Sequence, residues 1–416
     1  MTQVEPPRSL RVPIAWTVAG NVVYTLAQWA AVAVIAKTLG TEDVGVFALA
    51  ASVTAPILVL VQMQLRIVLA TDVRRTRPFA DYVVVRVWGA VALVVLSLGY
   101  AVVTGRARET VVAIGLFAVA KALDAVSDVL FGYHQRLERM DVIATSQVVN
   151  GVLSVVLLTA GVLASGELLV GMLGFAAGSL LNLVGYVLPV TLRAVRAETA
   201  PSPRNPPSPG RLSLVRTALP LATVLVLSAL ATTVPRLVVE ADLGAYSLGI
   251  FAGVSYVVLA AGNVVNSVGN AIAPRLARHH ADGDVAGFLR ILRFGVLFGV
   301  GLGLVGALLS WLVGGPVLSL LYTDDYAGAA GLLAALCLAS AISFAASFLL
   351  GAATAAQRFR AQLPTAAAST VAAVVVSLVA IPAYGLWGAV LATAATAVVQ
   401  LVGFAVVVRR ITQEAS

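Results

Sequence analysis

Twelve runs of about twenty apolar residues dominate this 416-residue sequence, and a run of that length crosses a lipid bilayer as one α-helix. The runs cover residues 13–36, 44–70, 82–103, 110–133, 141–164, 168–192, 217–240, 246–273, 288–313, 328–352, 364–381 and 384–408. Hydrophobic residues make up 60% of the chain and charged residues only 11%, whereas soluble proteins average about 25% charged residues. The sequence therefore predicts an all-α integral membrane protein with about twelve transmembrane helices, and it excludes a soluble enzyme.

The positive charges gather at one set of span ends. Twenty of the 27 Lys and Arg residues lie there, and three lie at the opposite ends. The remaining four lie inside apolar runs: Arg66, Arg86, Lys121 and Arg236. Because cytoplasmic loops carry the excess of Lys and Arg, this alternation predicts that both termini are cytoplasmic. Frequent Arg, Ala and Val beside only two Lys residues are typical of a GC-rich bacterial genome, so we expect the bacterial plasma (inner) membrane.

The chain is internally duplicated. Leu39–Ala48 resembles Leu243–Ala252 at an offset of 204 residues, and Asn182–Tyr186 resembles Gln400–Phe404 at an offset of 218. Each half holds six spans, so both halves enter the membrane in the same direction, as in a parallel repeat. Two six-helix bundles that rock about a central cleft would provide alternating access.

A proline-rich segment separates the two halves. Residues 195–212 contain five prolines, a composition that favours an extended linker without a packed core. The expected domains are an N-terminal six-helix bundle over 1–194, a cytoplasmic linker over 195–212 and a C-terminal six-helix bundle over 213–416.

The composition does not support the binding of nucleotides, metal ions or nucleic acids. Neither Lys follows a Gly, which excludes a G-x-x-x-x-G-K-[ST] phosphate loop. One Cys and three scattered His residues give no metal-ligand cluster. The net charge of +8 is explained by arginine-rich cytoplasmic loops rather than by binding to nucleic acid. We expect no cofactor, no metal and no enzyme activity.

Five parts of the chain carry a resemblance to a known family. They are Leu39–Ala50 at the start of span two, Gln64–Asp72 at its end, the start of the second half with Pro235–Arg236, Leu243–Gly244 and Gly249–Phe251, then Ala273–Ala277, and Leu320–Ala327. With these segments the chain resembles the Wzx-like polysaccharide flippases of the multidrug/oligosaccharidyl-lipid/polysaccharide (MOP) exporter superfamily. The resemblance implies a flippase that moves polyprenyl-diphosphate-linked oligosaccharide from the inner to the outer leaflet for polysaccharide biosynthesis, including that of lipopolysaccharide-type polymers.

Charged residues near the middle of a span mark functional candidates. Lys121, Asp124 and Asp128 lie at i, i+3 and i+7 in span four, on one helical face. Lys121 would bind the substrate diphosphate, and Asp124 or Asp128 would bind a coupling H⁺ or Na⁺. The alternative is a neutral Lys121–Asp124 pair that only packs between helices.

Two polar stripes correspond to each other through the repeat. Arg66 lies one turn from the end of span two, with Gln62 one turn deeper, and the 204-residue offset maps them onto Asn270 and Asn266. Asn263 extends the second stripe in span eight. We expect both stripes to bind substrate, because the planar guanidinium of arginine forms paired hydrogen bonds with a diphosphate. Alternatively, Arg66 would only reach the lipid head groups.

The remaining candidates have simpler alternatives. Arg236 would bind substrate in the cleft, or would form an i,i+4 ion pair with Glu240. Asn21 and Gln28 share one face of span one and would contact sugar hydroxyls or only bridge neighbouring helices. Arg86, one turn inside span three, is expected to be an interfacial anchor.

Two other functions remain open from the sequence. A drug/ion antiporter of the same superfamily would favour an acidic and aromatic cleft, whereas Arg66, Lys121 and Arg236 are cationic. A polyprenyl-linked glycan polymerase or ligase would need a large outer loop for its chemistry, and the outer loops here are short. The expected partners are membrane lipid, the lipid-linked oligosaccharide and other polysaccharide-assembly proteins, and we expect a monomer.

Overall fold

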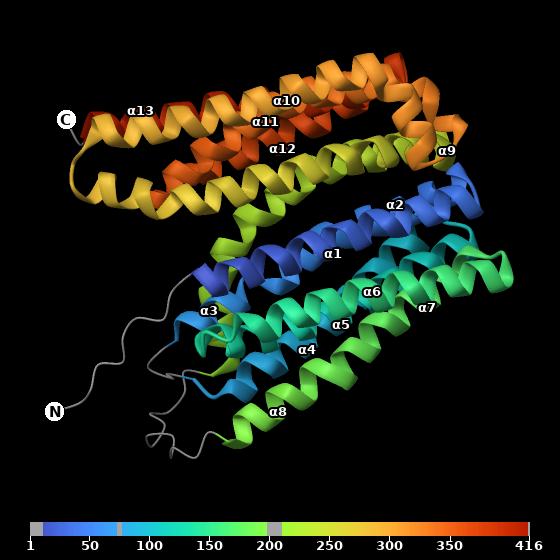
Figure 1. Cartoon of the computed structure of the whole chain (residues 1–416), viewed down its shortest axis with the longest axis horizontal. Coiled ribbons are helices and arrows are strands. Elements are labelled where there is room, and N and C mark those ends of the chain that lie inside the picture. Colours follow the sequence, from blue (N-terminus) through green and yellow to red (C-terminus); the bar gives the residue numbers. More distant parts are fainter. Residues whose placement is uncertain (1–10, 73–76, 198–209, 415–416) are drawn as a thin grey trace. The chain divides into compact units, whose positions relative to one another are not determined.

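The computed structural model describes residues 11–72, 77–197 and 210–414, and the described residues form helices joined by short turns. In chain order the helices are α1 (Arg11–Thr38), α2 (Thr41–Gln62), α3 (Leu65–Thr71), α4 (Phe79–Val103), α5 (Arg108–Arg136), α6 (Met140–Ser165), α7 (Leu168–Asn182), α8 (Leu188–Ala197), α9 (Arg211–Ala281), α10 (Val285–Leu321), α11 (Ala330–Ala355), α12 (Phe359–Tyr384) and α13 (Leu386–Glu414) (Figure 1). A π-helical turn, Leu183–Val187, joins α7 to α8, and a 3₁₀ helix, Asp324–Ala329, precedes α11. No strand occurs among these residues.

Eleven helical segments are long and apolar enough to cross a membrane. One of them, Leu225–Ala281, has 57 residues, which is about 85 Å of helix against a hydrocarbon core of about 30 Å. Gly244 divides this segment, because its φ of 83° and ψ of 176° are not helical. The eleven segments therefore contain twelve membrane-spanning helices, six on each side of residues 198–209, and the predicted all-α fold with twelve spans is confirmed. The central part of the predicted linker lies outside the described residues.

The chain forms two compact units. Unit 1 comprises Met1–Ala31, Val61–Gly99 and Gly115–Leu219, and unit 2 comprises Val32–Leu60, Tyr100–Ile114 and Pro220–Ser416. Unit 2 thus joins the end of α1, most of α2 and the turn between α4 and α5 to the C-terminal helices. The predicted boundary between the halves at residues 195–212 stays a prediction.

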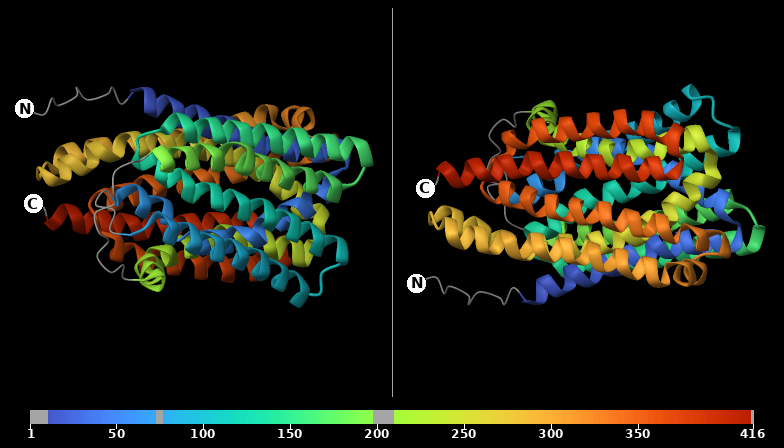
Figure 2. Two further views of the ribbon diagram at one scale, coloured as in Figure 1. Left: turned by 90° about the horizontal axis from the view of Figure 1, so that it is seen from below. Right: turned by 90° about the horizontal axis from the view of Figure 1, so that it is seen from above.

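Small residues let the helices of each unit approach closely, as is typical of packing within membranes. In unit 1, α6 packs on α7, and a Cβ on Gly174 would lie 2.3 Å from the backbone oxygen of Leu157. In unit 2, α11 packs on both α10 and α13, and Figure 2 shows these orange and red helices with nearly parallel axes. Gly299 and Gly303, one turn apart on α10, face Phe344 and Ala341 of α11.

Unit 2 also contains a reciprocal helix crossing. A Cβ on Gly45 of α2 would lie 1.8 Å from the backbone oxygen of Ala245 in α9, and a Cβ on Gly249 would lie 2.0 Å from the backbone oxygen of Thr41. The 204-residue offset of the repeat relates Gly45 to Gly249 and Thr41 to Ala245. Equivalent residues of the two sequence repeats therefore make equivalent contacts, and we call this contact the glycine crossing.

Polar contacts surround the glycine crossing. The hydroxyl group of Thr41 donates to Asp325 Oδ2 at 3.0 Å. The phenol of Tyr322, which is 1% exposed, donates to the backbone oxygen of Gly253 at 3.0 Å. These contacts fix the 3₁₀ helix and its flanking residues against α2 and α9.

Candidate functional site

A polar stripe runs along α5 in unit 1. Lys121, Asp124, Asp128 and Gln135 follow one another at helical spacing, and each forms a hydrogen bond with a side chain from another part of unit 1 or with a neighbour in the stripe. The prediction that Lys121, Asp124 and Asp128 share one face of a helix agrees with these contacts. The stripe holds two groups, which we call the Lys121 group and the Arg66 group.

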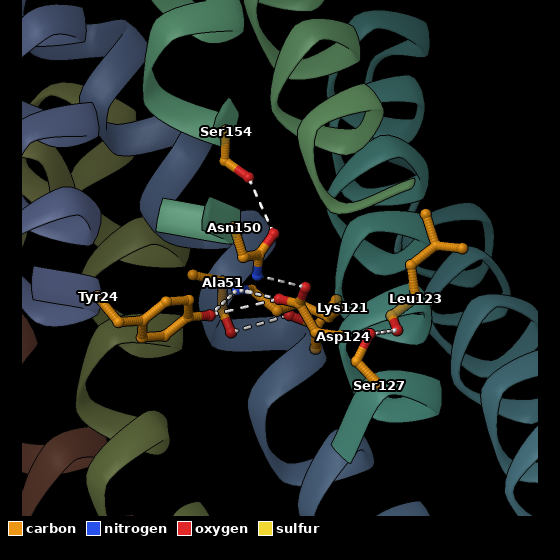
Figure 3. Close-up of polar contacts among 9 residues, drawn as sticks. Tyr24, Ala51, Lys121, Leu123, Asp124, Ser127, Asn150 and Ser154 are labelled. Carbon is orange, nitrogen blue, oxygen red and sulfur yellow. Dashed lines mark hydrogen bonds and ion pairs between the residues drawn. The ribbon is translucent and has the colours of Figure 1, made fainter. Parts of the chain in front are cut away.

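The Lys121 group joins α1, α5 and α6. Lys121 Nζ lies 3.0 Å from Asp124 Oδ2 and donates to the phenolic oxygen of Tyr24 at 3.2 Å. The Tyr24 hydroxyl donates to Asp124 Oδ2 at 3.3 Å, and Asn150 Nδ2 donates to Asp124 Oδ1 at 2.9 Å. Figure 3 shows these side chains pointing toward one another, with Ser154 above Asn150. The carboxylate of Asp124 therefore accepts hydrogen bonds from three side chains.

Aromatic rings enclose the ammonium group of Lys121. Its Nζ lies 5.3 Å from the ring centroid of Phe175, 5.4 Å from that of Phe117 and 5.8 Å from that of Tyr24, distances typical of cation–π contacts. The side chains of Lys121 and Asp124 are 12% and 18% exposed. Lys121 and Asp124 thus form the pair of zero net charge that was given as the alternative. Aromatic rings surround this pair, and both side chains remain partly accessible.

The Arg66 group joins α3, α4 and α5. Asp128 lies between two arginines, with Arg86 Nη2 at 3.1 Å and Arg66 Nη1 at 3.5 Å. Arg66 also donates from Nε to Gln135 Oε1 at 2.9 Å, and its guanidinium lies 5.7 Å from the ring centroid of Phe131. One carboxylate faces two guanidinium groups, so the Arg66 group carries a net charge of +1.

Arg66 is the accessible member of this group. Its side chain is 28% exposed, whereas Arg86 is 0% exposed. Among the described residues, none accepts a hydrogen bond from Arg66 Nη2. The guanidinium can therefore donate to a further anion without releasing Asp128.

Two expectations about this region are wrong. Span two is not one continuous helix, because Met63 and Gln64 have φ values of 44° and 53°, in the left-handed region that such residues seldom occupy. This break separates Gln62, the half-buried last residue of α2, from Arg66 in α3. Arg86 is not an interfacial anchor: it is buried and donates from Nη1 to the backbone oxygen of Val61 at 3.4 Å, beside the break.

Asn21 and Gln28, the two candidates predicted in span one, have different surroundings in the structure. Asn21 Oδ1 accepts from Gln147 Nε2 of α6 at 2.9 Å, so Asn21 bridges two helices. Gln28 is half-buried. Tyr24 was not among the predicted site residues, although it lies at i+3 from Asn21 and i−4 from Gln28 and thus on the same helical face. Asn150, an amide inside the apolar run of span five, was not predicted either.

The alternative ion pair in span seven does not form. Glu240 instead pairs with Arg106 from the turn between α4 and α5. Arg236 is half-buried, and it forms no ion pair with any carboxylate in the described part of the chain. Its charge therefore stays uncompensated inside unit 2.

The asparagine stripe lies on α9 in unit 2. Asn266 and Asn270 are exposed and Asn263 is half-buried. Their repeat counterparts, Gln62 and Arg66, belong to unit 1.

The described residues contain no group of three or more His, Cys, Asp or Glu side chains that could hold a metal ion, and Cys337 is buried.

Comparison with known proteins gives the family. Residues 12–280 match the Polysacc_synt family, described as polysaccharide biosynthesis protein. The chain belongs to this family. The capsular polysaccharide biosynthesis protein CapF of Staphylococcus aureus is 24% identical over 306 residues, which are 74% of this chain and 76% of CapF.

Solved transporter structures share the fold of this polysaccharide biosynthesis family member. The lipid II flippase MurJ in its inward closed conformation superposes with a TM-score of 0.74 at 12% identity, covering 97% of this chain and 90% of MurJ. An inward-facing multidrug resistance MATE family transporter of the MOP superfamily gives 0.68 at 15% identity, covering 96% and 95% of the two chains. The chain is therefore a multi-pass membrane protein that shares the fold of these transporters.

Proposed function

We propose that this protein is a flippase that moves polyprenyl-diphosphate-linked oligosaccharide from the inner to the outer leaflet of the bacterial plasma membrane. The family membership, the relation to CapF and the fold shared with the lipid II flippase MurJ support this function. Transport would proceed by alternating access, coupled to H⁺ or Na⁺, and would serve polysaccharide biosynthesis. The flippase would break no covalent bond and would need no resident cofactor.

The single observation that carries the proposal is the net positive charge of the Arg66 group. An unneutralised charge within a membrane-spanning region is costly and marks a functional residue. A diphosphate supplies the missing negative charge, and arginine suits it because a guanidinium donates two parallel hydrogen bonds to phosphate oxygens. Arg66 has both the exposure and the remaining donor for this role, and Arg236 provides a second uncompensated cation in unit 2.

The Lys121 group supports a role in ion coupling. Asp124 accepts hydrogen bonds from an ammonium group, a phenol and an amide. Protonating its carboxyl, or placing Na⁺ against it, would weaken its pairing with Lys121. We propose that this change frees Lys121 to bind the substrate anion, so that ion binding and substrate binding depend on each other. Asp128, held by two arginines, is the second candidate carboxylate.

Movement of a polyprenyl-diphosphate oligosaccharide across proteoliposome membranes tests the function. Charge-assisted hydrogen bonds contribute about 1.5–3 kcal/mol, so Arg66→Ala and Lys121→Ala should each slow this movement by about tenfold or more. Arg108→Ala is the matched control, because Arg108 is an exposed arginine at the start of α5. Reconstituted protein must be quantified, so that a loss of protein is not taken for a loss of transport.

The outcomes separate flippase from antiporter. Movement that requires Arg66 and Lys121 but not Arg108 supports the flippase. Absent movement of the lipid, together with ion-driven export of a cationic dye, would instead identify a drug/ion antiporter. We further propose that the protein is a monomer and that both of its termini lie in the cytoplasm. The labelling of engineered terminal cysteines in intact cells would check the location of the termini.

A further inference from the structure

A groove of about 510 Å³ opens between α10, α11 and α13 in unit 2. Its volume falls within the range of about 300–1,000 Å³ that is typical of small-ligand sites. Buried side chains from all three helices form its floor: Leu292 of α10 is 4% exposed, Leu349 of α11 is 9% exposed and Val408 of α13 is 5% exposed. These residues belong to the apolar core of unit 2, so the floor is rigidly packed.

Two exposed arginines line the same groove. Arg293 comes from α10 and Arg409 from α13, and neither forms an ion pair with a carboxylate of the described residues. Arg358, just before α12, is in contrast paired with Glu414 at the end of α13. The groove therefore combines an apolar floor with two positive charges that no described side chain compensates.

The exposed side of the groove is apolar beyond the arginines. Leu297, one turn after Arg293 on α10, also lines the groove and is 71% exposed. Both residues lie in the segment Val285–Leu321, which is long and apolar enough to cross a membrane. Arginines followed along a helix by exposed apolar side chains match the head group and the acyl chain of a lipid.

We propose that this groove binds one anionic glycerophospholipid, with its phosphate between Arg293 and Arg409 and an acyl chain along Val296 and Leu297. Basic pockets between transmembrane helices bind anionic head groups in this way. An isolated arginine that only reached the membrane surface would need neither a second arginine nor a groove. This site shares no residue with the Lys121 and Arg66 groups and does not depend on the proposed transport function.

Native mass spectrometry and thermal unfolding of the full chain in detergent test this site. The probes are phosphatidylglycerol, phosphatidylcholine with the same acyl chains, and glycerol phosphate, which has the anion without the chains. Phosphatidylglycerol should bind and raise the unfolding temperature of the wild-type chain more than either of the other probes does. Each arginine near an anionic lipid contributes about 1 kcal/mol, so Arg293→Gln/Arg409→Gln should weaken its binding by about tenfold or more.

Two further variants make the test specific. Arg290→Gln/Arg410→Gln removes two exposed arginines of the same helices that do not line the groove, and it should bind phosphatidylglycerol like the wild type. Ala405→Trp should fill the groove at an exposed lining position and weaken binding while leaving both arginines in place.

Three results would overturn the proposal. Equal losses in both double variants would show diffuse attraction between the lipid and the basic surface. Equal effects of phosphatidylcholine would show an apolar groove without charge selection, and equal effects of glycerol phosphate would show an anion site without an acyl chain. All variants alter exposed side chains, and unfolding in the absence of lipid verifies that each one is folded.

Discussion

Arg86 and Asp128 form an ion pair in which the arginine is fully buried while the aspartate remains 25% exposed. Arg66 contacts the same carboxylate from a more accessible position. The two arginines therefore differ in role although they share one partner: Arg86 holds α4, α5 and the end of α2 together, and Arg66 presents a charge. Substitution of Arg86 should therefore affect mainly stability, and substitution of Arg66 should affect mainly transport.

Arg86→Ala is expected to lower stability and membrane abundance, because it leaves Asp128 with a weaker partner and Val61 with an unsatisfied carbonyl. Breaking a buried pair costs about 3–5 kcal/mol, and the exposure of Asp128 places the expected loss at the lower end of that range. Arg66→Ala should change stability by less than about 1 kcal/mol while reducing transport. Thermal unfolding in detergent and membrane immunoblots measure both effects.

A double variant provides the control for Arg86. Arg86→Ala/Asp128→Asn removes the unpaired carboxylate together with the arginine, so it should recover part of the lost stability. Normal abundance and unfolding temperature in Arg86→Ala alone would contradict a structural role for this residue.

The glycine crossing should tolerate no side chain. A methyl group on Gly249 meets the backbone oxygen of Thr41, so Gly249→Ala must push α2 away from α9. Overpacking of this kind costs about 1–3 kcal/mol, and the unfolding temperature should fall. Gly301→Ala on α10 is the matched control, since nothing lies within 4 Å of a Cβ there, and it should leave the unfolding temperature unchanged or slightly higher.

Cross-linking the residues beside the crossing should stop transport reversibly. Thr41 and Asp325 are joined by a hydrogen bond of 3.0 Å, so cysteines at both positions can approach closely in a chain that also carries Cys337→Ala. If the contact must open during transport, oxidation should abolish movement of the lipid-linked oligosaccharide and a reductant should restore it. Full transport by the oxidised protein would mean that this contact stays closed throughout the cycle. Each single-cysteine variant serves as the control.

The start of α10 should depend on pH through Asp284, which lies outside the spans. Asp284 accepts from the backbone N–H of Gly287 at 2.8 Å, and this bond, aided by the nearby His279, lowers the pKa of its carboxyl. A lowered pKa stabilises the folded form above the ordinary value of 3.8, and the benefit is lost as the pH falls through the folded-state pKa.

Hydrogen exchange at the first turn of α10 measures this effect. Relative to Asp284→Ala, the wild-type chain should protect this turn near neutral pH, and the difference should shrink in acid. Asp282→Ala, which alters an exposed residue of the same loop, should behave like the wild type. A protection difference that stays constant with pH would rule out the titration of Asp284 as its cause.

The sequence predicted what depends on local spacing. Apolar run lengths gave the twelve spans, and helical periodicity placed Lys121, Asp124 and Asp128 on one face. Partners distant in the chain were not accessible in this way: Asp128 pairs with Arg86, 42 residues away, and Glu240 pairs with Arg106, 134 residues away. Such pairs depend on how the helices pack, which no single-helix pattern encodes. The break at Met63 and Gln64 was missed for a similar reason, because neither Gly nor Pro marks it.

The glycine crossing has the form of an isologous interface between identical subunits, although it lies within one polypeptide. In such an interface each contact occurs twice, so a change on one side is matched on the other. Here duplication has separated the two copies, and each can change without the other. The glycine crossing has a glycine in both copies, Gly45 and Gly249. In contrast, the positions equivalent to Gln62 and Arg66 are Asn266 and Asn270. One chain therefore combines a contact that is equivalent in both repeats with a charge present in only one of them, which a symmetric dimer of six-helix units could not do.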